Sequence, residues 1–224
     1  MSYLRKTFID FLKTFEVSAK NPSEDAQRRW REAVGTLVKN RRRRFSMVPN
    51  LDKRSRAERQ RHNIQHVVLV SIGSLGKNRT TDRVENVSVD TCLLTNTTNG
   101  VRIKSWQGGM GSTRDLRFES IVMKNVSNPI IIDQYYCDQP TPCANQTEAV
   151  EVRKVEFVDV RGTSATAQAI KIACSDTVPC TELELRNVNL TVVGEGAATA
   201  SCYKASGKAV GIVVPASCLD KGDP

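Results

Sequence analysis

Six of the seven cysteines fall into short spacings that could support redox or metal chemistry. They form the candidate pairs Cys137/Cys143, Cys174/Cys180 and Cys202/Cys218, and Cys92 is left over. The first two pairs share one spacing, and each flanks a loop that contains proline. This arrangement predicts three local disulfides. A zinc site is the alternative, although four-thiolate sites favour closer pairs and no histidine follows His66.

Charge divides the chain close to the point where the cysteines begin. Residues 1–66 carry 17 lysines and arginines against 7 acidic residues, whereas the remaining 158 residues carry 16 against 17. The net charge of +9 therefore describes the first part alone, and the second part has no basic field of its own. We predict two unlike units, at 1–66 and 67–224.

The second unit contains a repeat. From residue 84 onward, stretches that alternate Val, Ile or Leu with polar residues recur between turns. The units begin at Val84, Leu116, Val150 and Glu182, at separations of 32, 34 and 32 residues. Stacked units of this kind with asparagine-rich corners are typical of a right-handed parallel β-helix. A β-sandwich has similar strand spacing, but the likeness of the units to one another favours the β-helix.

The first unit is predicted to be a basic α-helical segment. A helix start at Asn21-Pro-Ser-Glu24 precedes the run of arginines, and Pro49 ends the helical pattern. The bulky apolar residues of this helix are Trp30, Val34, Leu37 and Val38, with Phe45 further along. Such a helix fits a calmodulin-type groove, because apolar anchors fill the groove and arginines meet its acidic rim. A solvated or nuclear-targeting run is one alternative, and electrostatic binding to phosphate backbones is another.

Four strings carry a resemblance of this first unit to a known family. They are Phe15-Glu-Val17, Lys20-Asn-Pro-Ser-Glu-Asp-Ala-Gln-Arg-Arg-Trp-Arg31, Asn40-Arg-Arg-Arg-Arg-Phe45 and Val48-Pro-Asn-Leu-Asp-Lys-Arg54. With them, about residues 2–65 resemble the N-terminal autoinhibitory, calmodulin-binding region of plant calcium-pumping ATPases. The resemblance implies that Trp30 and Phe45 anchor calmodulin. The membrane helices and the phosphorylated-aspartate motif of such pumps are not in this sequence.

Four other strings carry a second resemblance, over about residues 70–220. They are Ser71-Ile-Gly-Ser-Leu-Gly76, Thr95-Asn-Thr-Thr-Asn-Gly-Val-Arg-Ile-Lys104, Ile130-Ile-Ile-Asp-Gln-Tyr-Tyr-Cys137 and Pro215-Ala-Ser-Cys218. In this order they resemble the downstream half of a plant polygalacturonase of glycosyl hydrolase family 28. The resemblance implies a partial pectin lyase-like β-helix, truncated upstream, and hydrolysis of α-1,4-galacturonan, the backbone of pectin, in cell-wall carbohydrate metabolism.

The same resemblance assigns roles to three residues. It implies that Arg102 and Lys104 bind substrate, which is chemically sensible because polygalacturonate presents one carboxylate per sugar and paired cations on a β-face suit it. Tyr136 matches the active-site tyrosine of the family in a Gln-x-Tyr context. Packing beside Cys137 as a loop aromatic is the alternative role for this tyrosine.

The catalytic groups of that family are not found. Inverting glycosidases need an acid and a base, which this family takes from an Asn-Thr-Asp segment and an adjacent pair of aspartates, with a Gly-His-Gly histidine alongside. The sequence contains neither Asn-Thr-Asp nor Asp-Asp, and Val67 to Leu69 occupy the Gly-His-Gly positions. We therefore expect no catalytic residue, and the alternatives are a non-catalytic pectin-binding module or a calmodulin-binding regulatory fragment of a calcium ATPase.

Compartment signals disagree between the two units. Met1 to Val17 is interrupted by charges, so no signal peptide is expected and the chain as written would be cytosolic. Disulfides and six Asn-X-Ser/Thr triplets instead indicate an oxidising, secretory compartment, and the polygalacturonase resemblance implies the cell wall. We expect a fusion joined near residues 66–70, with no membrane span, no cofactor and no metal. Pectin and calmodulin are the expected partners, and nucleic acid is not.

Overall fold

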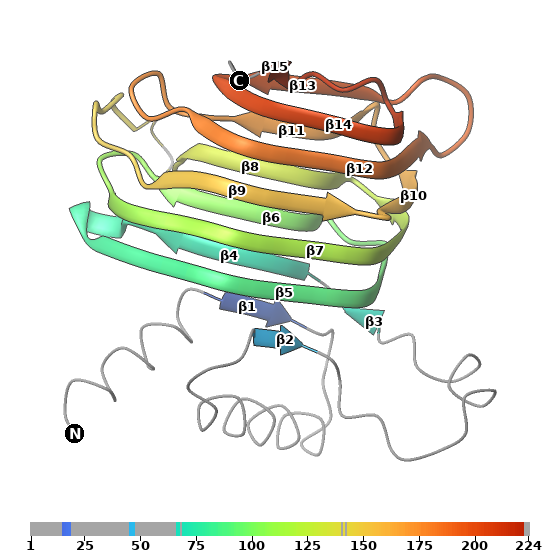
Figure 1. Ribbon diagram of the computed structural model, residues 1–224, viewed down its shortest axis with the longest axis horizontal. Helices are drawn as coiled ribbons and strands as arrows, with labels where there is room; N and C mark the ends of the chain where they lie inside the picture. Colours follow the sequence, from blue (N-terminus) through green and yellow to red (C-terminus); the bar gives the residue numbers. More distant parts are fainter. Residues whose placement is uncertain are drawn as a thin grey trace, which may run out of the picture.

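The computed structural model describes residues 69–139, 141 and 143–221, together with three short strands that precede them, Phe15–Ser18, Phe45–Met47 and His66–Val67. From residue 69 onward the chain winds through successive coils whose strands pair in parallel (Figure 1). The expected parallel β-helix is confirmed. No helix in the described part is both long and apolar enough to span a membrane.

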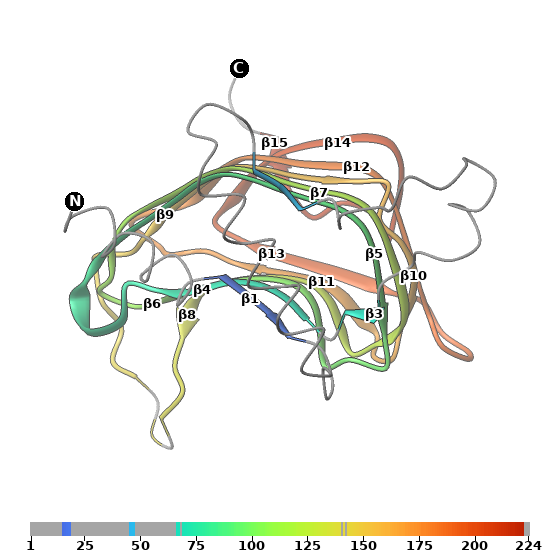
Figure 2. The same cartoon turned by 90° about the horizontal axis from the view of Figure 1, so that it is seen from below.

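Each coil contributes one strand to a first sheet of shorter strands. Its parallel strands are β4 (Leu69–Leu75), β6 (Asn99–Trp106), β8 (Asn128–Tyr136), β11 (Gln168–Ala173) and β13 (Thr199–Tyr203). A short 3-10 turn, Lys77–Arg79, leads from β4 into the second sheet. Seen along the stack in Figure 2, the strands of this sheet superimpose as one wall of the coil.

The second sheet contains longer strands that bend around the rest of the coil. They are β5 (Thr81–Thr95), β7 (Met110–Val126), β9 (Glu151–Val158), β10 (Arg161–Ser164), β12 (Cys180–Val192), β14 (Ala205–Val214) and β15 (Asp220–Lys221). Figure 2 shows β5 and β7 curving over the top and down one side of the coil. The two sheets enclose the core between them.

Bends in the long strands come from left-handed residues stacked from coil to coil. Asn86, Asp115, Lys154 and Glu182 all have φ between 53° and 59° at equivalent positions of β5, β7, β9 and β12. A second corner holds Asn96 and Asn125, where the Asn125 side-chain amide donates to Asn96 Oδ1 at 2.8 Å. Asparagine tolerates this backbone region better than most residues, which explains the asparagine-rich corners of the sequence.

The core is a set of ladders of apolar side chains. In the first sheet, Ile103, Ile132 and Ile172 are buried in register on adjacent strands. The facing strands supply Phe118 and Phe157, whose rings stack with centroids 5.4 Å apart. Burying a side chain of this size stabilises the fold by about 1.5–3 kcal/mol, and repetition along the stack builds one continuous core.

The repeat length differs from the sequence prediction. Val87, Leu116, Val155 and Leu183 are the true equivalents in strand register, which gives coil lengths of 29, 39 and 28 residues. The expected separations of 32, 34 and 32 residues were wrong because the unit starts Val84, Leu116, Val150 and Glu182 are not equivalent in strand register, and because β8 and β9 are joined by a long connection. That connection carries the Cys137–Cys143 disulfide and lengthens one coil only.

Three short strands pair with the first coil. β1 (Phe15–Ser18) lies antiparallel to β4, and β2 (Phe45–Met47) and β3 (His66–Val67) lie parallel to β5. The prediction of a helix was wrong at Phe15 and Phe45, because an uncovered sheet edge offers backbone groups that pair an added strand. The other expected calmodulin anchors, Trp30, Val34, Leu37 and Val38, lie outside the described residues.

The disulfides join the three expected pairs. Cys137–Cys143, Cys174–Cys180 and Cys202–Cys218 have Cα–Cα distances of 5.9, 5.7 and 5.3 Å. Cys92 is a free thiol, and burial, with help from the charge of Asp90, raises its pKa to about 11. In the described part of the chain no group of three potential ligands could hold a metal ion.

Candidate functional site

The outer face of the first sheet carries two rows of side chains that run along the axis of the β-helix. Side chains alternate between the core and the outside along each strand, so strand register defines which outer residues are neighbours. The first outer row is Arg102, Ile131, Lys171 and Ser201, and the second outer row is Lys104, Asp133, Ala173 and Tyr203. Charged and aromatic groups on these rows form the candidate site.

Arg102, Lys104 and Tyr136 come together on this face. The Arg102 guanidinium carbon lies 5.1 Å from the centre of the Tyr136 ring, and Lys104 Nζ lies 5.0 Å from the same centre. These distances are within the range of cation–π attraction, about 0.5–1 kcal/mol each at an exposed site. We call these three residues the cationic cluster. The structure brings Tyr136, at the end of β8, against two cations that lie together on β6.

Close backbone packing holds Lys104 in place. Gly73 lies in β4 with φ of +111°, and a Cβ there would stand 2.1 Å from the Lys104 carbonyl oxygen. Only glycine allows β4 and β6 to approach in this way. Arg102 is likewise held, since its guanidinium lies 3.8 Å from Asp133 and its side chain is 20% exposed.

The cationic cluster continues toward the corner of the coil through Trp106 and Lys77. The Trp106 indole meets the Tyr136 ring edge to face at 5.3 Å, and Lys77 Nζ lies 5.0 Å from the centre of the indole. Lys77 also pairs with Asp138 at 3.7 Å. Sequence reasoning missed both residues. Trp106 could have been found because it follows Lys104 by two positions in one strand, but Lys77 required the tertiary structure.

The acidic side chains of this face have partners of their own. Asp133 pairs with Arg102 and accepts a hydrogen bond from the Tyr135 backbone N–H at 3.0 Å. Asp176 accepts hydrogen bonds from the hydroxyl groups of Tyr135 and Tyr203. Both carboxylates therefore have ordered neighbours on the outer face of the first sheet.

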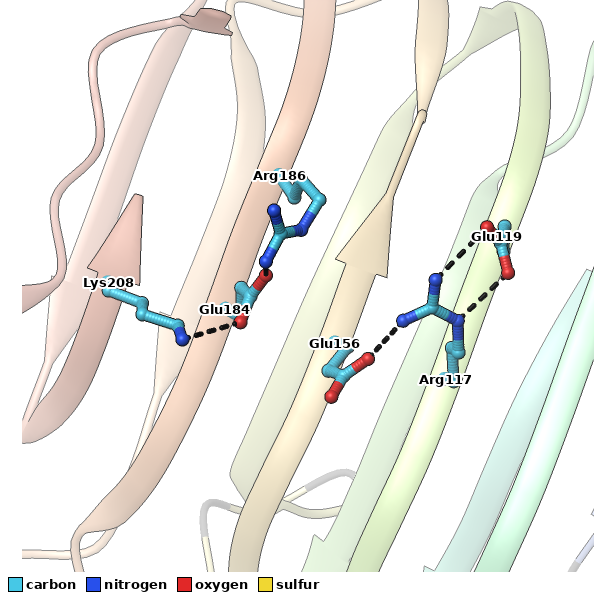
Figure 3. Close-up of polar contacts among 6 residues, drawn as sticks. All are labelled: Arg117, Glu119, Glu156, Glu184, Arg186 and Lys208. Carbon is cyan, nitrogen blue, oxygen red and sulfur yellow. Dashed lines mark hydrogen bonds and ion pairs between the residues drawn. The ribbon is translucent and has the colours of Figure 1, made fainter. Parts of the chain in front are cut away.

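The outer face of the second sheet is different, because its charges pair among themselves. Figure 3 shows Arg117 between Glu119 and Glu156, and Glu184 between Arg186 and Lys208. These six side chains contain three positive and three negative charges. Such a balanced cluster offers a polyanion no net attraction.

The pKa values of the paired carboxyl groups reflect this network. The hydrogen bond from Arg117 lowers the pKa of Glu119, against the opposing effect of burial. Burial would raise the pKa of Glu184, but hydrogen bonds from Lys208 and Arg186 outweigh it and lower the value. Both groups stay ionised at neutral pH, so the pairs persist there.

Comparison with known proteins identifies the family of this chain. Residues 68–218 match the family model of glycosyl hydrolases family 28. The chain belongs to glycosyl hydrolase family 28. The family 28 match includes every strand from β4 to β14 and both outer rows of the first sheet.

Several relatives of this family 28 chain are plant proteins. It is 50% identical over 151 residues to a probable polygalacturonase of Arabidopsis thaliana, covering 67% of this chain and 34% of that protein. It is 50% identical over 133 residues to a polygalacturonase of Persea americana, covering 59% and 29%, and 44% identical over 151 residues to one of Prunus persica, covering 67% and 38%. The chain thus spans about a third of the length of these relatives.

A second family model matches the other end of the chain. Residues 12–56 match the Ca2+-ATPase N terminal autoinhibitory domain. Within this range the structure describes only β1 and β2. The expected boundary between two units at residues 66 and 67 stays a prediction.

Proposed function

We propose that this family 28 chain binds galacturonan through the cationic cluster, as a polygalacturonase-like protein. The observation that carries the proposal is the convergence of two cations on one aromatic ring, on a flat outer face. Guanidinium and ammonium groups bind carboxylates through charge-assisted hydrogen bonds, and the exposed part of a ring can pack against a sugar. The three disulfides support residence in an oxidising compartment such as the cell wall.

We also infer that the chain by itself does not hydrolyse galacturonan. Inversion needs two carboxyl groups on opposite sides of the scissile bond, one to protonate the leaving oxygen and one to activate water. On the described outer face, Asp133 is paired with Arg102 and Asp176 accepts from two tyrosines. Neither contact pairs one carboxyl with another, and the sequence lacks the family's adjacent aspartates.

Affinity electrophoresis in gels that contain polygalacturonate tests the proposal. The double variant Arg102→Ala/Lys104→Ala should lose retention, whereas the charge-matched variant Lys124→Ala/Arg161→Ala should keep it. Lys124 and Arg161 are exposed on strands β7 and β10 of the second sheet, away from the outer rows of the first. Unchanged retention of the first variant would overturn the binding proposal, and release of reducing ends by the wild-type chain would overturn the inference of inactivity.

The match of residues 12–56 supports a second function, calcium-dependent binding of calmodulin through the first unit. In this proposal Trp30, Val34, Leu37 and Val38 supply the apolar anchors of the helix. The full chain should bind immobilised calmodulin in calcium and be released by a chelator. Trp30→Ala should weaken this binding by tenfold or more, and binding that persists without calcium would exclude the calmodulin mode.

A further inference from the structure

Two tyrosines and one aspartate from three coils meet on the outer face of the first sheet. Tyr135 OH donates to Asp176 Oδ2 at 3.3 Å, and Tyr203 OH donates to Asp176 Oδ1. Tyr135 lies near the end of β8, Tyr203 ends β13, and Asp176 lies between them in the loop closed by Cys174–Cys180. We call these three residues the tyrosine–aspartate clamp.

The clamp lies along the same axis as the cationic cluster. Tyr203 belongs to the second outer row, in which Lys104, Asp133 and Ala173 precede it on successive strands. Three strand spacings separate Lys104 from Tyr203, a distance of about 14 Å. Ala173 has a small side chain, so it projects little from the sheet surface between Asp133 and Tyr203. A polysaccharide laid along the axis over Tyr136 would therefore reach the clamp within a few sugars.

The chemistry of the clamp is opposite to that of the cationic cluster. Tyr203 is 49% exposed, so its ring is available to a sugar, while its hydroxyl is already used as a donor to Asp176. A carboxylate has about four acceptor positions, so Asp176 can still accept hydrogen bonds from sugar hydroxyls. Its negative charge repels the carboxylate of an ionised galacturonate. The hydrogen bond with Asp176 also raises the pKa of Tyr203, which keeps the phenol protonated and uncharged.

We propose that the tyrosine–aspartate clamp binds an uncharged sugar residue, such as a methyl-esterified galacturonate, a few sugars along the polymer from an ionised residue held by the cationic cluster. This inference rests on the proposed galacturonan-binding function and names the substrate class for it. The face would then prefer partly esterified galacturonan to the fully ionised polymer. The cation nearest to the clamp in the outer rows is Lys171, which lies two positions before Ala173 on β11 and serves as a control of opposite sign.

The experiment measures binding of the full chain to two oligogalacturonans of equal length by titration calorimetry, one fully ionised and one partly methyl-esterified. Asp176→Asn keeps the shape and one acceptor oxygen but removes the charge. It should raise affinity for the ionised oligomer about fivefold, as expected for a repelling unit charge about 4 Å away in water, and change affinity for the esterified one less than twofold. Lys171→Ala should weaken binding of the ionised oligomer instead.

Two tyrosine variants test the ring separately from the hydroxyl group. Tyr203→Phe keeps the ring and should retain binding of the esterified oligomer, whereas Tyr203→Ala should weaken it about tenfold. If Asp176→Asn and Tyr203→Ala leave the ratio of the two affinities unchanged, the clamp inference is overturned. Loss of binding in Arg102→Ala/Lys104→Ala alongside that result would leave the proposed function standing. Retention of binding in that double variant would overturn the proposed function itself.

Discussion

The indole of Trp106 meets the ring of Tyr136 edge to face, with centroids 5.3 Å apart and planes at 80°. The two residues lie on adjacent strands, β6 and β8, and Trp106 is opposite Tyr136 in the strand register. Because Arg102 and Lys104 contact the same tyrosine ring, Trp106 is one ring away from both cations. Ligand binding at the cationic cluster is therefore expected to change the environment of the Trp106 indole.

Replacing Tyr136 separates the contribution of its ring from that of its hydroxyl group. Tyr136→Ala removes the ring that positions both cations and that can pack against a sugar, and we expect galacturonan binding to weaken about tenfold. Tyr136→Phe keeps the ring and should bind within about twofold of wild type. Fluorescence of Trp106 in a Trp30→Phe background measures both, since the sequence has only these two tryptophans. Equal weakening by both variants would assign the effect to the hydroxyl.

The stacked rings of Phe118 and Phe157 lead to a prediction of how much stability is lost when a core side chain is truncated. Both side chains are fully buried, so Phe157→Ala should lower the free energy of unfolding by about 3–5 kcal/mol. Phe157→Leu leaves a smaller void and should cost less. Urea denaturation followed by circular dichroism measures both variants. A cost below about 1 kcal/mol for alanine would mean that neighbouring coils collapse into the space.

The stacked asparagines Asn96 and Asn125 lead us to expect different losses of stability from two small substitutions at Asn125. Asn125 has φ of 55° and donates to Asn96 across the coils. Asn125→Ala loses the hydrogen bond and places an alanine in the left-handed region, at a combined cost of about 2–3 kcal/mol. Asn125→Gly loses the hydrogen bond but not the backbone freedom, and should cost only about 1 kcal/mol. Equal thermal stability of the two variants would show that backbone strain plays no part at this corner.

The ion pairs of the second sheet predict a dependence of stability on pH. The pKa of Glu184 is below its ordinary value of 4.5, so the unfolded chain binds more protons than the native one as pH falls past that value. The stabilisation is therefore present above about pH 5 and is lost as pH falls through the native pKa. Glu184→Gln should be less stable than wild type at pH 7, and the difference should shrink toward pH 3.

Chemical denaturation at a series of pH values checks this prediction. Glu195 is exposed in the loop between β12 and β13, and Glu195→Gln supplies the matched control that should follow the wild-type curve. A difference between Glu184→Gln and wild type that stayed constant from pH 7 to pH 3 would contradict the assignment. In that case packing of the glutamate stem, and not its charge, would explain the loss.

The local pattern of residues by itself predicted the fold. Alternation of Val, Ile and Leu with polar residues places Ile103, Ile132 and Ile172 inside and Arg102 and Lys104 outside, because a strand presents successive side chains to opposite faces. Short cysteine spacings indicated the three disulfides for a similar reason, since each pair closes a local loop. The cationic cluster was named from residues whose roles a resemblance implied, and its contact geometry needed the structure.

Only the tertiary structure decided which residues are neighbours from one coil to the next. The long connection between β8 and β9 changes the coil length to 39 residues at one step, so a fixed period misaligns the rows. For this reason spacing alone could not show that Tyr135, Asp176 and Tyr203 are neighbours. Tyr135 and Tyr203 are 68 residues apart in the chain. The pairing of β1 and β2 with the first coil also depends on tertiary structure, because the partner strands are distant in sequence. Local helix propensity is small, so the backbone hydrogen bonds offered by an open sheet edge can override it.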